Sequence, residues 1–242
     1  MPSLKFHPQV GAALAALGLV ACAGSGGALD RAASEFLARE AVAATQELAP
    51  DASRYASHNL EWRDAARSRA VPARLYLPAG DAGPSPLVVV SHGIGGSREG
   101  YKYLGRYLAA NGIAALHLQH TGSDRQLWFG NPLGLLGRLS GAAQESEALM
   151  RAMDVRFALD ELLTGPWASR IDASRIAVAG HSYGANTAML VAGARLERDG
   201  REMALRDARI RAAILISAPP FYGLANAPDI VGAIAVPTLH IT

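Results

Sequence analysis

The chain has 242 residues, half of them hydrophobic, and a formal net charge of +2 at pH 7. A chain of this size and apolar content can bury one sizeable core, so we expect a single domain. The basic residues are spread along the sequence, which argues against nucleic acid as a partner. The one cysteine, Cys22, excludes an internal disulfide.

An export signal is predicted at the N-terminus. Lys5 precedes an apolar run at 10–20 that is too short to span a bilayer comfortably. Residues 19–22 (Leu-Val-Ala-Cys) resemble a bacterial lipobox, which implies lipidation of Cys22 and a membrane anchor at the outer membrane or the periplasmic face. Cleavage at the Ala-Cys-Ala of 21–23 is the alternative, and it would release a soluble periplasmic or secreted protein.

Three regions follow from this interpretation. Residues 1–22 are expected to be a signal peptide with a lipobox, and residues 23–50 a small, Gly-rich tether with a helix over 29–48. Residues 51–242 are expected to form the folded domain.

Strand and helix patterns alternate along this domain, which predicts an α/β fold. Its sheet should be mostly parallel, with antiparallel N-terminal strands and helices on both faces. Residues 128–141 have no clean period and are expected to be a loop or a lid, which could line an acyl pocket; packing of its apolar side chains in the core is the alternative. The expected strands are 60–64, 71–77, 87–90, 113–118, 176–179, 212–217 and 237–241, and the expected helices are 101–110, 144–163 and 183–198.

A nucleophile elbow is predicted between the strand 176–179 and the helix after it. Residues Gly180, His181, Ser182, Tyr183 and Gly184 have the G-x-S-x-G pattern. The serine must occupy a strained turn that lifts its oxygen above the sheet edge, and the two glycines allow neighbouring backbone to pass close by. We therefore expect Ser182 to be the nucleophile. The alternative is an ordinary tight turn with an inert serine.

An oxyanion loop is predicted after the strand 87–90. Residues 91–96 are Ser-His-Gly-Ile-Gly-Gly, and acyl transfer needs two N–H donors aimed at the developing oxyanion. We assign one donor to Ile94, in the motif that His92 and Gly93 begin. The other is assigned to Tyr183, the residue after the nucleophile.

These motifs together resemble the platelet-activating-factor acetylhydrolase and dienelactone-hydrolase-like branch of the α/β-hydrolases. The similar segments are 88–101, 117–124, and 151–160 leading into 180–184, and the resemblance covers about 60–242. It implies a serine esterase that acts on small-molecule or lipid esters, including acetyl esters, without a cofactor.

The end of the chain departs from this resemblance. The triad acid and then the histidine should follow the nucleophile, and the family carries the acid after the strand that begins at 236. We therefore expect the domain to be incomplete at the C-terminus, with both residues beyond Thr242. His240 lies inside a predicted strand and is a poor candidate base. Asp229 stays an alternative acid.

Two further polar residues are candidates at the substrate side. His120 and Asp124 follow the strand 113–118, where ligand sites collect in open sheets, and a loop-fixing role is the alternative. No metal-ligand spacing and no nucleotide-type phosphate loop are present in the sequence. The rival to an esterase is a non-catalytic surface protein that keeps the hydrolase fold.

Overall fold

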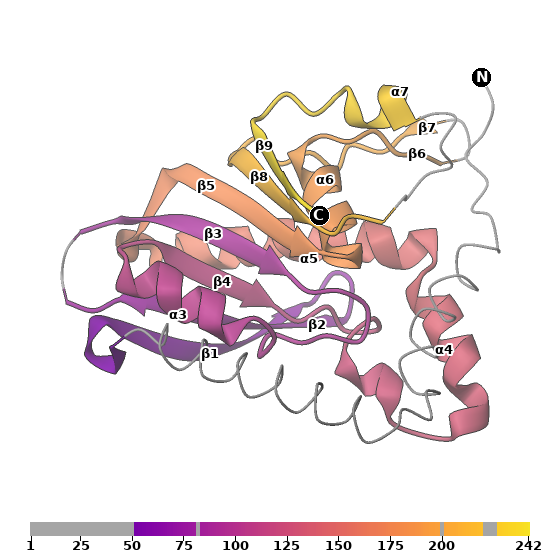
Figure 1. Ribbon diagram of the computed structural model, residues 1–242, viewed down its shortest axis with the longest axis horizontal. Coiled ribbons are helices and arrows are strands. Elements are labelled where there is room, and N and C mark those ends of the chain that lie inside the picture. Colours follow the sequence, from indigo (N-terminus) through magenta and orange to yellow (C-terminus); the bar gives the residue numbers. More distant parts are fainter. Residues whose placement is uncertain (1–50, 81–82, 199–200, 220–226) are drawn as a thin grey trace, which may run out of the picture.

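The computed structural model describes residues 51–80, 83–198, 201–219 and 227–242. The predicted signal peptide, tether and first helix, together with Cys22, lie outside the described residues. A seven-stranded sheet with the strand order β1-β2-β4-β3-β5-β8-β9 forms the centre of the molecule (Figure 1).

The sheet has an antiparallel beginning and a parallel remainder, as predicted. β1 pairs with β2, and β2 with β4, in antiparallel fashion; all the other pairs are parallel. The strands are β1 (Tyr55–Asp64), β2 (Arg69–Pro78), β3 (Ser85–Ser91), β4 (Ala114–Leu118), β5 (Ile171–His181), β8 (Ile210–Ile216) and β9 (Thr238–Ile241). A separate small hairpin consists of β6 (Glu197–Arg198) and β7 (Arg201–Glu202).

Helices cover both faces of the sheet (Figure 1). The strand face that carries Leu75 packs on α5 (Glu145–Thr164) and α6 (Tyr183–Ala192) in the main core. The opposite face carries Tyr76, which packs with Ala109 of α3 (Lys102–Ala110). Successive strand residues therefore enter different cores, as expected for a sheet buried on both sides. The α/β class and the doubly covered sheet predicted from the sequence are confirmed.

The remaining described helices are short. They are α4 (Leu135–Ala142), α7 (Ala227–Val231), η1 (Ala52–Arg54), η2 (Arg125–Trp128), η3 (Pro132–Gly134) and η4 (Ala168–Arg170). No helix among the described residues has the length and apolar character needed to cross a membrane.

Two expectations need correction. The helix expected over 183–198 ends at Ala192, because Gly193 adopts a left-handed φ of 122° that stops it, and 197–198 enter the strand β6. The segment 128–141, expected to be a loop or a lid, is not an irregular loop, because it contains η3 and most of α4; its role as a lid or as an acyl-pocket lining stays a prediction.

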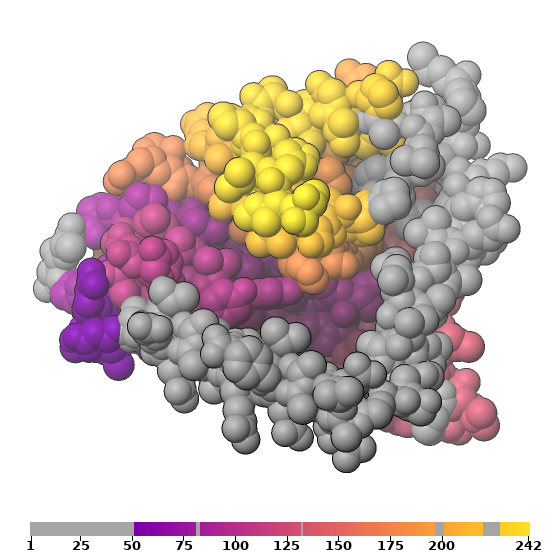
Figure 2. All heavy atoms as spheres, in the orientation of Figure 1, coloured from indigo at the N-terminus to yellow at the C-terminus, as the bar shows by residue number. Residues whose placement is uncertain are grey.

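Parallel strands bring their carboxyl ends to one edge of the sheet. β3, β4 and β5 end at Ser91, Leu118 and His181, so the segments after them meet at that edge. At one side of the sheet, β9 lies at the surface and all four of its residues are exposed (Figure 2, yellow).

Candidate active site

Ser182 lies in the strand–turn–helix context that the motif requires. It sits between β5 and α6 with φ 53° and ψ −122°, outside the usual regions for a side chain that is not glycine. Such strain costs about 1–3 kcal/mol and persists only when neighbouring contacts hold it. Two hydrogen bonds do so here: the Ser182 N–H donates to the Ile216 carbonyl (2.9 Å), and the Ser182 carbonyl accepts from the Ala185 N–H (2.8 Å).

The two motif glycines permit close backbone contact around this turn. A Cβ at Gly180 would overlap the carbonyl of Gly184, and a Cβ at Gly184 would overlap the carbonyl of Ser91. The end of β3 therefore touches the first turn of α6. A Cβ at Gly93 would lie 3.4 Å from the Ser182 Cβ, so the loop after β3 faces the serine.

The N–H groups of this loop divide into two pairs. Those of Gly95 and Gly96 donate to the carbonyls of Ser123 (2.8 Å) and Gly93 (3.1 Å). Within the described part of the chain, the N–H groups of Gly93 and Ile94 have no hydrogen-bond acceptor. Ile94 itself packs against the main core, which anchors its backbone. The loop thus offers free donors beside Ser182.

A fully buried arginine lies beneath the loop. Arg151 of α5 is 0% exposed, and its guanidinium lies over the Tyr183 ring, 4.8 Å from the centroid. Burial lowers the pKa of Arg151 to about 10, which leaves it charged at neutral pH. It donates to four oxygens: Thr187 Oγ1 (3.0 Å), Ser123 Oγ (2.9 Å), Ser91 Oγ (3.2 Å) and the His92 carbonyl.

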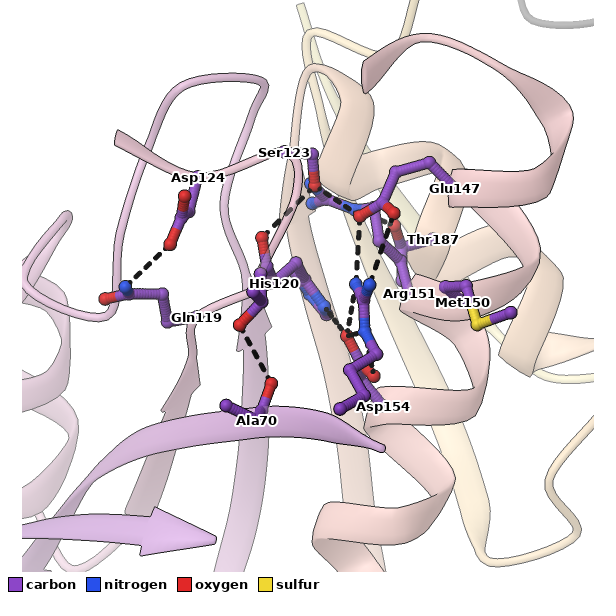
Figure 3. Close-up of polar contacts among 12 residues, drawn as sticks. Ala70, Gln119, His120, Ser123, Asp124, Glu147, Met150, Arg151, Asp154 and Thr187 are labelled. Carbon is purple, nitrogen blue, oxygen red and sulfur yellow. Dashed lines mark hydrogen bonds and ion pairs between the residues drawn. The ribbon is translucent and has the colours of Figure 1, made fainter. Parts of the chain in front are cut away.

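A serine, a histidine and an aspartate form a hydrogen-bonded chain next to this arginine. Ser91 Oγ lies 2.9 Å from His120 Nε2, and His120 Nδ1 lies 3.0 Å from Asp154 Oδ2 (the last pair is drawn in Figure 3). This is the bonding order of a serine-protease triad. However, all three side chains are 0% exposed, so Ser91 cannot reach a substrate. This hydrogen-bonded set of three side chains instead helps to hold the residues around the site in place.

Hydrogen bonds also define the tautomers of the two buried histidines. His120 Nδ1 faces a carboxylate and carries its proton, so its Nε2 accepts from Ser91. The His120 backbone N–H donates to His92 Nε2 (3.1 Å), so His92 Nδ1 carries the proton and donates to the Gly93 carbonyl (2.6 Å).

Asp154 is held by two arginines as well as by His120. Arg67 Nη1 and Arg69 Nε lie 2.8 Å and 2.9 Å from Asp154 Oδ1, and Arg69 also pairs with Glu147 (2.9 Å). Burial raises the pKa of Asp154, against the lowering effect of Arg69 and Arg67. Burial also lowers the pKa of Arg69. The hydrogen bonds and charges of Asp154 and Glu147 outweigh this effect, so the pKa of Arg69 is raised overall.

The two candidate substrate-side residues are buried. Asp124 is 1% exposed, accepts from Gln119 Nε2 (2.8 Å; Figure 3) and caps η2 through the Gln126 N–H (3.2 Å). His120 is bonded as described above. These contacts match the loop-fixing alternative, and a role on the substrate side stays a prediction. His181 is partly buried, and its ring lies 5.5 Å from that of Tyr101.

Sequence reasoning missed Arg151 and Asp154 as members of the site, and it gave Ser91 no role of its own within the predicted oxyanion loop. A signal was present, because Arg151 and Asp154 are charged residues three positions apart on the helix predicted over 144–163. Charged side chains at buried helix positions indicate an internal partner. The partners themselves lie on other strands and loops.

Among the described residues, no base or acid forms a hydrogen bond with the Ser182 hydroxyl. Asp229 lies in α7, and His240 lies exposed in β9, where Nε2 is 3.2 Å from Thr238 Oγ1. Neither forms a hydrogen bond with Ser182. The same residues contain no group of three or more His, Cys, Asp or Glu side chains placed to hold a metal ion.

The buried histidines predict that acid destabilises the fold. Burial lowers the pKa of His92 and His120 well below the usual value, and that of His117 to about 4. Below about pH 6.5 the unfolded protein then binds more protons than the folded protein. The contribution of the neutral histidines to the free energy of unfolding is therefore full above that pH and is lost as the pH falls toward 4. Each neutral imidazole should remove about 2 kcal/mol of the free energy of unfolding between pH 7 and pH 5, partly offset by the raised pKa of Asp154.

Urea unfolding at a series of pH values measures this dependence. The variant His117→Gln should have a shallower profile, and the exposed-site control His240→Gln should match the parent. A free energy of unfolding that stays constant from pH 8 to pH 5 would show that these imidazoles are not held neutral.

Comparison with known proteins gives the class of the fold. No family model and no curated protein matches the sequence. A ferulic acid esterase from Streptomyces cinnamoneus superposes with a TM-score of 0.58 at 22% identity, over 78% of this chain and 73% of that chain. A dienelactone hydrolase-like promiscuous phosphotriesterase from metagenomic libraries superposes with a TM-score of 0.55 at 22% identity, over 77% of this chain and 68% of that chain.

A third structure, an acetyl xylan esterase from Paenibacillus, gives a TM-score of 0.50 at 23% identity, over 69% of this chain and 50% of that chain. Together with the seven-stranded, mostly parallel sheet, these similarities identify the fold as that of the α/β-hydrolases. At such low sequence identities the similarity concerns the fold alone.

Proposed function

We propose that this protein is a serine hydrolase that cleaves carboxylic esters with Ser182 as its nucleophile. The observation that carries the proposal is the left-handed turn at Ser182, held at the N-terminus of α6 with the Gly93–Ile94 loop against it. A strained serine between a buried strand and a helix is the arrangement that α/β-hydrolases use for acyl transfer.

The chemistry would proceed through an acyl-enzyme. The Ser182 oxygen attacks the ester carbonyl carbon and its proton passes to a base, while the Ile94 and Tyr183 N–H groups stabilise the oxyanion. Collapse of the tetrahedral intermediate breaks the bond between the acyl carbon and the alcohol oxygen, and the alcohol leaves with the proton that the base had taken from Ser182. Water then gives a proton to the base and attacks the acyl carbon. The bond to the Ser182 oxygen breaks, the carboxylic acid is released, and the base returns the proton to the Ser182 hydroxyl. The helix dipole of α6 supports negative charge at the same place.

The substrate class is a small-molecule carboxylic ester. Two of the structurally similar proteins carry the names of carboxylic-ester hydrolases, a ferulic acid esterase and an acetyl xylan esterase. The resemblance of the 88–101 and 117–124 segments to the acetylhydrolase branch adds acetyl and lipid esters to the proposal. The lipobox at residues 19–22 further supports export and lipid anchoring through Cys22, which would bring the site to a membrane.

A second candidate is a non-catalytic protein with the hydrolase fold. It is favoured by one observation: within the described residues, no imidazole or carboxylate forms a hydrogen bond with the Ser182 hydroxyl. Acyl transfer at a useful rate needs a base, because the serine hydroxyl is a weak nucleophile at neutral pH.

Labelling with a fluorophosphonate separates these functions. Ser182 should be phosphonylated slowly, and Ser182→Ala should abolish the adduct seen by mass spectrometry. Ser217→Ala is the matched control, since Ser217 also has a positive φ (46°) at the end of the adjacent strand β8. Its labelling should equal that of the parent.

Hydrolysis of p-nitrophenyl acetate by the 242-residue chain should be very slow. Oxyanion stabilisation without a triad base leaves only a residual acceleration, about 10³–10⁴-fold over water in serine proteases. An adduct on another residue, or equal labelling of the Ser182→Ala variant, would refute the proposed nucleophile. Rapid turnover that vanishes in Ser182→Ala would show that a base acts in this chain.

A further inference from the structure

The oxyanion loop is fixed by its carbonyl groups. The Gly93 carbonyl accepts from His92 Nδ1 (2.6 Å), and the His92 carbonyl accepts from Arg151 Nη2. In a trans peptide the C=O and N–H groups point in opposite directions. Because each carbonyl points away from the N–H of its own peptide, fixing the His92 and Gly93 carbonyls also fixes the directions of the Gly93 and Ile94 N–H groups.

Arg151 brings a positive charge to this arrangement. It reaches the His92 carbonyl from α5, a helix far along the chain, and its other donors are bonded to Thr187, Ser123 and Ser91. A guanidinium presents its donors in a rigid fork, so four acceptors at once define its position. The loop is thereby tied to the helix α5 and, through Thr187, to the helix that follows the nucleophile.

Hydrogen bonds connect the buried charge of Arg151 to two carboxylates. Ser123 accepts from Arg151 and donates to Glu147 Oε1 (2.8 Å). Ser91 accepts from Arg151 and donates to His120, which donates to Asp154. Each serine proton is directed away from the cation, so the hydroxyl dipoles support its charge. A buried charge without such support would be very costly.

We infer that Arg151 is a positioning residue for the oxyanion loop, and that the buried Ser91–His120–Asp154 chain stabilises its charge. The inference rests on the proposed function, because it concerns the N–H groups assigned to oxyanion binding. Arg151 does not touch a substrate, since it is fully buried. It acts through the His92 carbonyl.

The test compares Arg151→Lys with the parent in two measurements. Lysine keeps the charge but cannot reproduce the fork. In fluorophosphonate labelling, the rate constant for inactivation should fall about 10- to 100-fold, because misplaced transition-state donors cost about that much. The apparent binding constant of the reagent should stay within about twofold. In hydrogen–deuterium exchange, the Gly95 and Gly96 amides should exchange at least about tenfold faster.

Arg156→Lys is the matched control. Arg156 lies on the same helix, is exposed and also donates to a backbone carbonyl, that of Ala204 (3.1 Å). It should change neither measurement. Thr187→Val is the second variant, which removes the acceptor of Arg151 Nε and keeps the arginine. This variant should lower the rate constant for inactivation by an intermediate factor. If Arg151→Lys does not fold, Thr187→Val alone tests whether Arg151 positions the loop.

The outcomes distinguish the inference from the proposed function. If the parent is labelled at Ser182 and the Arg151 and Thr187 variants keep its rate and its amide protection, the inference is overturned and the proposed function stands. If the parent is not labelled at Ser182, the proposed function fails. The exchange of the Gly95 and Gly96 amides then still decides whether Arg151 positions the loop.

Discussion

Gly184→Ala is expected to lower the free energy of unfolding by more than about 4 kcal/mol or to prevent folding. The added Cβ would overlap the Ser91 carbonyl oxygen and lie 2.8 Å from the His92 carbonyl oxygen. Both obstacles are backbone, so no side-chain rotation relieves them. The end of β3 and the first turn of α6 would have to separate, and the loop after β3 would move with that strand.

The matched control is Gly137→Ala. Gly137 lies in α4, and a Cβ there would meet nothing within 4 Å. Alanine has a higher helix propensity, so this variant should gain about 0.5–1 kcal/mol. Urea unfolding followed by circular dichroism compares the two, with Ser182 labelling as a second readout. A Gly184→Ala variant within about 1 kcal/mol of the parent would mean that the elbow and β3 are not packed as described.

Asp154→Ala is expected to cost about 3–5 kcal/mol, because it leaves buried charges without their partner. The carboxylate accepts from Arg67 Nη1 (2.8 Å), Arg69 Nε (2.9 Å) and His120 Nδ1 (3.0 Å), and it is 0% exposed. Asp154→Asn keeps the shape and one acceptor oxygen, so its loss should be smaller. The same urea titrations measure both variants.

Asp160→Ala provides the comparison on the same helix. Asp160 is paired with Arg209 at 2.6 Å, but its side chain is 65% exposed. Exposed pairs contribute about 0–1 kcal/mol and are screened by salt. Asp160→Ala should therefore be nearly neutral, with little remaining effect in 1 M NaCl. Equal losses for Asp154→Ala and Asp160→Ala would contradict the assignment of Asp154 as a buried structural anion.

The fold and the elbow could be predicted because their signals are local. A continuous apolar run marks a strand covered on both faces, as at Leu87–Val90, and Gly180 to Gly184 specify a turn within five residues. Element boundaries were less accurate. β5 begins at Ile171 although residues 172–175 carry three polar side chains, because pairing with β3 extends the strand beyond its apolar part.

The buried polar network could not be predicted in the same way. Arg151 meets Ser91 and His92 across about 60 positions of sequence, and Asp154 meets Arg67 across 87. A single sequence shows that these residues are charged, but their partners depend on how the sheet and α5 pack. In the Ser91–His120–Asp154 chain the bonding order of a triad surrounds a serine that is fully buried, so this order alone does not identify a nucleophile.

The position of β9 has a consequence for the sheet as a whole. Its inner side is bonded to β8, while Leu239 and Ile241 are 56% and 46% exposed. A strand at the edge of a sheet presents a row of backbone donors and acceptors outward. Apolar side chains on such a strand favour its burial against other atoms. Among the described strands, β9 therefore differs from the buried β3 and β4: it joins the sheet along one side only, and backbone pairing with β8 rather than core packing holds it there.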